Sequence, residues 1–240
     1  MSDDLRKFLA NARGSAASAR VLRLDDLVVR LGQLGPEVDA EASPWGLAAM
    51  RGRLVELSAR GAAATLTTAA ELVLEAQRAA EPVAWVVPWL AASSGTFYPP
   101  DVADTGIDLA ALVVVRAPST IAAARAAERL LRSGAFGLVV LDFASSCLGD
   151  LEANRAQRLP DQVLGRLVSL AQSHDAAVIC LTEKTSETGS VGSLVSMRAE
   201  AMRLRSSSGG FEVTIRALKD KRRGPGWSKR LKVRGPAGMG

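Results

Sequence analysis

The sequence has few of the residues from which metal sites and many active sites are built. It contains one histidine, His174, and two cysteines, Cys147 and Cys180, whose spacing matches no metal-binding pattern. A lone histidine near a predicted helix end, with no acid or nucleophile to work with, is typical of a capping or surface residue. We therefore expect no metal site, and we expect both cysteines to be buried, reduced packing residues.

Long apolar runs and aromatic side chains are also scarce. No uninterrupted apolar stretch reaches the roughly 20 residues that cross a bilayer. The first residues include two acids, Asp3 and Asp4, where a signal peptide would be basic. These features argue against a membrane protein and predict a cytoplasmic one. Aromatic residues make up 4% of the 240 residues and hydrophobic residues 48%, which predicts a globular α/β domain packed by small aliphatic side chains.

Apolar runs and amphipathic stretches alternate along the chain and predict its strands and helices. The predicted strands are residues 54–57, 83–87, 112–115, 138–142 and 176–181, of which 83–87, 138–142 and 176–181 are expected to be buried. The predicted helices are residues 65–80, 101–109, 120–132 and 161–173, with Ser119 as a cap. Alternating segments at 197–204 and 210–218 predict antiparallel strands, and Leu231 and Val233 suggest a third. This order predicts a mostly parallel, twisted sheet flanked by helices, with antiparallel strands at the C-terminal end.

The stretch from Arg51 to Thr68 has the strand, loop and helix order of a phosphate-binding loop but lacks its chemical groups. Such a loop, G-x-x-x-x-G-K-[ST], brings backbone amides close to phosphate, and its lysine and hydroxyl serve the terminal phosphates and magnesium. Aligned on this pattern, Ala59 and Ala64 replace the glycines, Thr65 replaces the lysine and Leu66 replaces the hydroxyl residue. Leucine cannot bind a metal ion, so we expect no nucleotide cofactor here.

Three segments of the chain resemble RecA recombinases. Residues 52–57 (GRLVEL) resemble the strand that leads into the RecA ATP loop. Residues 133–142 (SGAFGLVVLD) resemble the segment with the second nucleotide motif, and residues 176–182 resemble the next core strand. The resemblance covers roughly residues 46–232 and implies a RecA-like core. It places Asp142 at the magnesium-associated aspartate, but the lysine and hydroxyl partners are missing, so we expect a structural or vestigial carboxylate.

Among RecA relatives that have lost the ATP loop, the sequence most resembles the ImuA family, which serves mutagenic translesion synthesis in the bacterial SOS response to DNA damage. This resemblance implies a non-catalytic adaptor. Its implied partners are an ImuB-type Y-family polymerase homologue, an error-prone replicative-type DNA polymerase, RecA and damaged DNA. One alternative is a SulA-like inhibitor of cell division. Another is a RecA-like ATPase in which the backbone around Gly61 meets phosphate and Arg60 replaces the lysine.

The chain is predicted to have three parts: an N-terminal segment (1–45), a core domain that ends in a basic strand region (46–234) and a flexible tail (235–240). In the N-terminal segment, Leu5, Phe8 and Leu9 lie on one face of a predicted helix. RecA proteins grip a neighbouring subunit with their N-terminal helix and strand. The resemblance therefore implies that this apolar face binds a partner or a second copy, and packing on its own domain is the alternative.

Charge is divided unevenly along the chain. Residues 1–197 carry 18 Lys and Arg against 22 Asp and Glu, whereas residues 198–240 carry 12 against 3. Such an end predicts an anionic partner, and we expect DNA. The candidate nucleic-acid-binding residues are Lys219, Lys221, Arg222, Arg223, Trp227, Lys229, Arg230, Lys232 and Arg234. Trp227 is predicted to stack on an unpaired base; the alternative is a solvated basic edge with Trp227 folded inward.

The polar segment between residues 182 and 195 is a weaker candidate. It stands where RecA proteins have a flexible DNA-binding loop, so the resemblance implies a contact with DNA. Its two acids, Glu183 and Glu187, argue against that contact and favour an ordinary solvent-exposed loop.

Overall fold

The computed structural model describes residues 43–61, 63–88, 102, 105–144, 159–205 and 211–233. The chain divides into two units, Met1–Ala40 and Glu41–Gly240, and every described residue belongs to the second. The sequence predictions for Leu5, Phe8, Leu9, Cys147, Arg234 and the tail fall outside the described residues. Trp45, placed by the sequence at the end of the N-terminal segment, lies in the core of the second unit with 2% of its surface exposed.

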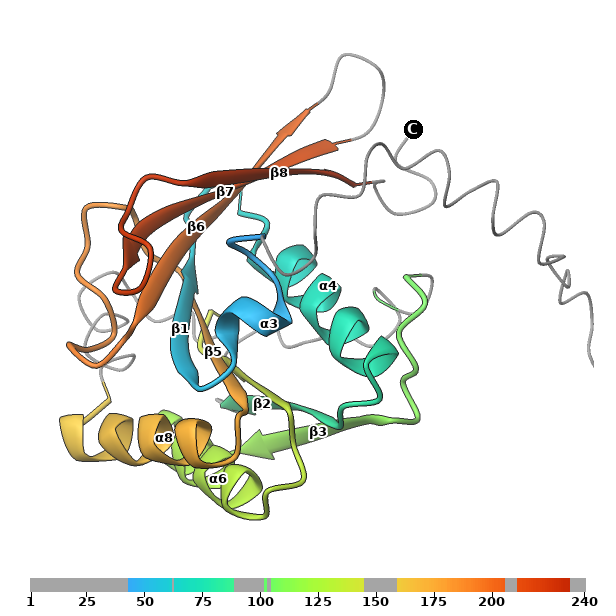
Figure 1. Ribbon diagram of the computed structural model, residues 1–240, viewed down its shortest axis with the longest axis vertical. Coiled ribbons are helices and arrows are strands. Elements are labelled where there is room, and N and C mark those ends of the chain that lie inside the picture. Colours follow the sequence, from blue (N-terminus) through green and yellow to red (C-terminus); the bar gives the residue numbers. More distant parts are fainter. Residues whose placement is uncertain are drawn as a thin grey trace, which may run out of the picture. The chain divides into compact units, whose positions relative to one another are not determined.

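An eight-stranded sheet forms the centre of the described residues (Figure 1). Its strands are β1 (Arg53–Ser58), β2 (Val83–Pro88), β3 (Leu112–Ala117), β4 (Leu138–Asp142), β5 (Ala177–Thr182), β6 (Met197–Arg205), β7 (Phe211–Asp220) and β8 (Ser228–Val233). Their order across the sheet is β3-β2-β4-β5-β1-β6-β7-β8. The strands from β3 to β6 pair in parallel, and β7 and β8 continue the sheet antiparallel. The predicted α/β class and the antiparallel C-terminal end are confirmed.

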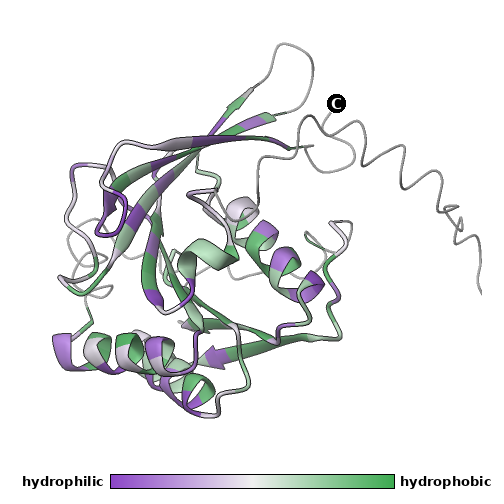
Figure 2. Ribbon diagram, viewed as in Figure 1, coloured by the Kyte–Doolittle hydropathy of each residue, from purple (hydrophilic) through white to green (hydrophobic). Residues whose placement is uncertain are grey.

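Helices pack on both faces of the parallel strands (Figure 1). They are α3 (Leu47–Met50), α4 (Thr65–Arg78), α6 (Thr120–Arg132) and α8 (Asp161–Ser173). Side chains of α3 and α4 share one apolar core with alternate residues of the sheet, and those of α6 and α8 share a second core with the residues between. In Figure 2, α4, α6 and α8 each show both hydrophobic and hydrophilic residues, as expected of amphipathic helices that pack on a sheet.

Burial on two faces accounts for the apolar runs of the central strands. Every residue of β1, β2, β4 and β5 is buried, which is the normal state of parallel strands covered by helices. The edge strand β3 is more open, and it exposes 42% of Val113 and 39% of Val114. The predicted cap is also present, because the Ser119 hydroxyl accepts a hydrogen bond from the Ala122 amide at 3.2 Å.

The predicted helix at residues 101–109 is wrong over its second half. Val102 is helical, but Thr105 and Gly106 form a turn, and no helix follows up to β3. Gly106 adopts a positive φ of 90°, and the Asp108 carboxylate accepts a hydrogen bond from the Ala110 amide. Such local bonds compete with helical ones. Of the helices that the structure describes, none combines the length and apolarity that crossing a bilayer requires.

Candidate functional sites at the two edges of the sheet

The carboxyl end of β1 is the first place to look for a binding site. The connection from β1 to β2 runs through α4 on one face, whereas α6 and α8 cover the other face. In open α/β sheets, ligands bind at the carboxyl ends of strands where the connections diverge in this way. Residues 59–64, which join β1 to α4, stand at that position.

Backbone hydrogen bonds close this loop onto the protein. The Ala64 amide donates to the Ala201 carbonyl at 3.0 Å, and the Ala63 amide donates to the Gly61 carbonyl at 2.8 Å. Ala63 also forms an isolated antiparallel bridge with Met202 of β6. A phosphate cradle needs amides that converge on the ligand, whereas these two are already engaged.

The side chains around the loop do not fit a nucleotide either. Thr65 is buried with 6% exposed, and Leu66 exposes 46% of its surface at the start of α4. Thr65 stands at the lysine position and has no ammonium, and Leu66 stands at the hydroxyl position and has no hydroxyl. The residues present therefore do not fit ATP with magnesium.

Asp142 ends β4 as a fully buried residue. Its Oδ2 accepts a hydrogen bond from the indole Nε1 of Trp85 at 3.3 Å. β5 lies between β4 and β1, so the carboxylate is separated from the loop after β1 by a whole strand. Trp85 is a core residue with 1% exposed, and its bond gives Asp142 a structural contact.

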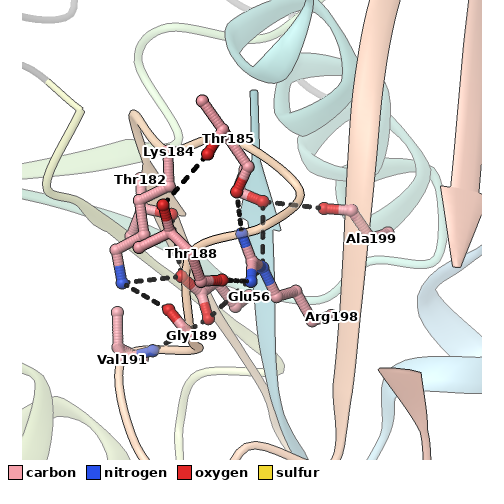
Figure 3. Close-up of polar contacts among 10 residues, drawn as sticks. Glu56, Thr182, Lys184, Thr185, Thr188, Gly189, Val191, Arg198 and Ala199 are labelled. Carbon is pink, nitrogen blue, oxygen red and sulfur yellow. Dashed lines mark hydrogen bonds and ion pairs between the residues drawn. The ribbon is translucent and has the colours of Figure 1, made fainter. Parts of the chain in front are cut away.

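Close to the same edge, a buried group of charges joins β1, β6 and the segment 183–196 (Figure 3). Glu56 of β1 is fully buried; its Oε1 lies 3.2 Å from the Lys184 ammonium and its Oε2 4.0 Å from Arg198 Nε. Glu56 also accepts hydrogen bonds from the Thr182 hydroxyl and the Val191 amide, each at 2.9 Å. Lys184 and Arg198 are 95% or more buried, so two cations share the single Glu56 carboxylate away from water.

Arg198 extends this charge group to the backbone of the segment. Its guanidinium donates to the carbonyl oxygens of Thr185 and Thr188 and to the Ser58 hydroxyl. Lys184 donates to the Gly189 carbonyl at 3.4 Å. Segment 183–196, which stands where RecA proteins have a flexible DNA-binding loop, is thus bonded to the sheet at several points. Glu183 and Glu187 of this segment remain exposed.

Sequence reasoning missed this charge group. Glu56 lies inside the apolar run of a predicted strand, and its partners Lys184 and Arg198 follow more than a hundred residues later. One signal in the sequence could have revealed it. Glu56 stands in an apolar run that a parallel sheet buries on both faces, and a buried carboxylate needs a partner.

The basic turn, which we define as Lys221, Arg222 and Arg223, lies at the opposite ends of the parallel strands, the amino ends. It follows β7, whose last residue Asp220 is paired with Met197 at the start of β6, so it lies at the amino end of β1 and β6. All three side chains are exposed. The structure thus places the basic turn and the loop after β1 at different edges.

Asp220 fixes the backbone of the basic turn. This buried carboxylate lies 2.6 Å from the Arg53 guanidinium and accepts hydrogen bonds from the Arg222 amide and the Trp227 indole. Burial alone would raise the pKa of Asp220, but the bonds from Arg222, Arg53 and Trp227 outweigh it, and the pKa lies below the ordinary value. The Gly224 amide also donates to the Asp220 carbonyl at 2.9 Å.

Two of the candidate nucleic-acid residues turn toward the core instead. The Trp227 ring lies 6.4 Å from the Trp45 ring between centroids, and its indole N–H is taken by Asp220 at 3.1 Å. Lys229 donates to the Trp45 carbonyl at 3.1 Å and to the Ser43 hydroxyl at 3.3 Å. Trp227 therefore has the inward position of the alternative interpretation and not the exposed one that stacking on a base requires.

Other basic residues lie along the strands themselves. Arg230 and Lys232 are exposed on β8, and hydrophilic colour recurs along β7 and β8 in Figure 2. Arg230 lies 3.6 Å from Glu212, and Arg216 of β7 lies 2.8 Å from Glu200. The pKa of Lys219, at the end of β7, is lowered by partial burial and by the neighbouring Lys221.

No protein-family model matches the sequence, and comparison with curated proteins finds no relative. Within the part of the chain that the structure describes, no group of three or more metal-ligating side chains occurs.

Proposed function

We propose that the protein is a non-catalytic adaptor with a RecA-like core that acts in DNA damage tolerance. The observation that carries this proposal is the closed loop after β1, where the Ala63 and Ala64 amides bond to the protein's own carbonyls. The parallel sheet with its two helical layers supports the core assignment, and Thr65 and Leu66 support the absence of ATP chemistry. These features disfavour the ATPase alternative.

The proposed partners follow from the resemblance to the ImuA family. They are an ImuB-type polymerase homologue, an error-prone replicative-type polymerase and RecA, with DNA as the anionic partner of the basic end. We place this work in the cytoplasm during the SOS response. The +9 balance of residues 198–240 favours this reading over a SulA-like inhibitor, which needs no DNA-binding end.

Co-expression with an ImuB-type polymerase homologue tests the proposal. We expect the two proteins to co-purify and to form a complex with micromolar affinity or better. The variant Leu5→Ser/Phe8→Ser/Leu9→Ser tests whether the N-terminal face carries the contact. Exposed Leu204→Ser on β6, a position 59% exposed, serves as the control for loss of an apolar side chain. Absence of any complex at micromolar concentration contradicts the proposal.

A further inference from the structure

The basic turn has a fixed backbone before any ligand binds. The Lys221 amide donates to the Ser196 carbonyl at 2.9 Å, the Arg222 amide donates to the Asp220 carboxylate at 2.9 Å, and the Gly224 amide donates to the Asp220 carbonyl at 2.9 Å. Because Asp220 is itself held by Arg53, the turn is anchored to the central strand β1. Binding an anion here costs little ordering of the main chain.

Two cations of the basic turn, Lys221 and Arg222, contact backbone carbonyl groups. The Lys221 ammonium donates to the Ser193 carbonyl at 3.0 Å, and the Arg222 guanidinium donates to the Arg51 carbonyl at 3.4 Å. Both acceptors are neutral, so the cations keep their charge. The neighbouring acid Asp220 is already paired with Arg53 beneath the turn.

The outer face of the antiparallel strands differs in this respect. Its arginines at 216 and 230 face carboxylates at 200 and 212 at distances of 2.8 and 3.6 Å. Lys229 is turned toward the Trp45 carbonyl. An anion can therefore meet Lys221 and Arg222 without displacing a carboxylate, in contrast to the two arginines of the strands.

The aromatic groups at this edge are turned away from solvent. Trp227 is half-buried with its N–H bonded to Asp220, and Trp45 is buried beneath it. Single-strand binders combine a basic groove with rings on which bases stack. Among the residues that the structure describes, no exposed ring accompanies the basic turn. A cation cluster of this kind matches a ligand with dense phosphate charge, and duplex DNA carries one charge per about 1.7 Å of its axis.

We propose that the basic turn, Lys221, Arg222 and Arg223, is the site at which this protein contacts the phosphate backbone of double-stranded DNA. The inference rests on the proposed function in that DNA is the anionic partner, and it adds the surface and the form of the nucleic acid. Contact with phosphates alone gives affinity without base reading.

Fluorescence anisotropy of the full chain with a labelled duplex, and with one of its strands, tests this at several salt concentrations. The turn variant Lys221→Gln/Arg222→Gln/Arg223→Gln is compared with the strand variant Arg216→Gln/Arg230→Gln/Lys232→Gln. Both remove three positive charges from exposed side chains. Thermal unfolding of each variant verifies that it is folded before DNA binding is compared.

We expect the wild type to bind the duplex more tightly than the single strand. The slope of log affinity against log salt is negative, and in the turn variant it should become shallower by about 1 for each side chain, or about 3 in all. The strand variant should keep most of the slope. Equal losses in the two variants overturn the assignment to the turn, and tighter binding of the single strand overturns the assignment to duplex DNA.

The result also separates this inference from the proposed function. If the wild type binds neither DNA form at low salt, the DNA contact in the proposed function fails together with the inference. If the wild type binds DNA and the turn variant binds equally well, only the inference fails. The adaptor function is tested independently by the complex with the polymerase homologue.

Discussion

Arg53 and Asp220 form a buried ion pair that joins the first residue of β1 to the last residue of β7. The guanidinium Nη2 lies 2.6 Å from Oδ1, and the two side chains expose 3% and 0% of their surface. The same carboxylate holds the Arg222 amide and the Trp227 indole. One buried pair thus connects the centre of the sheet to the basic turn.

Removing the carboxylate should destabilise the fold strongly. We expect Asp220→Ala to lower the free energy of unfolding by about 3–5 kcal/mol, because it leaves the Arg53 charge buried without its partner. Urea unfolding followed by tryptophan fluorescence measures the change. Glu212→Ala, which breaks the exposed pair with Arg230, is the control and should cost at most about 1 kcal/mol. Similar costs for both variants would contradict the importance of the buried pair.

The contribution of Asp220 should disappear in acid. Its pKa in the folded protein lies below the ordinary value of 3.8, so the stabilisation is present above that value and is lost as the pH falls through the folded pKa. We expect the stability difference between wild type and Asp220→Asn to be constant from about pH 7 to pH 5 and to shrink below about pH 4. A difference that grows in acid would have the wrong sign for this account.

Substitution of Glu56 should release the segment that the buried charge group holds. Glu56→Ala removes the acceptor of the Val191 amide and leaves Lys184 and Arg198 without a counter-charge. Hydrogen exchange should accelerate in residues 183–196 more than in β2, and stability should fall by about 3–5 kcal/mol. Glu187→Ala, at an exposed carboxylate of the same segment, should leave exchange nearly unchanged. Uniform acceleration along the chain would argue against local anchoring.

Cys180 should be chemically silent in the folded protein. It is a free, fully buried thiol, and burial raises its pKa, so it presents almost no thiolate to a reagent. A Cys147→Ser variant isolates its reactivity. We expect a disulfide reagent to label this variant only when urea unfolds it. Labelling at the same rate in the native and unfolded protein would show that β5 is accessible.

The sequence could predict the layers of the fold because the apolar runs are unambiguous. The run at residues 138–142, for example, has one structural solution in a sheet covered on both faces, and β4 has those bounds. The ion-pair partners of the charged residues in β1 could not be predicted. Glu56 pairs with Lys184, and Arg53 pairs with Asp220, only through tertiary contacts. Trp227 illustrates the same limit, because its inward position depends on Trp45.

The sequence predicts that basic residues cluster at the C-terminal end, but not which of their side chains are exposed. Composition identifies nine candidate residues, whereas the strand pairing sends Lys229 inward and leaves the basic turn exposed. Alternation along a strand gives two faces, but not which face carries compensating carboxylates such as Glu212. That information comes only from the register of β7 against β8.

We infer that the loop after β1 does not hold a triphosphate, and calorimetric titration with ATP and magnesium tests this inference most directly. We predict no saturable heat up to millimolar nucleotide for the wild type. We predict the same for Thr65→Lys/Leu66→Ser, because restoring the side chains leaves the Ala63 and Ala64 amides bonded to Gly61 and Ala201. Saturable, magnesium-dependent binding by the wild type at micromolar concentration would contradict the account.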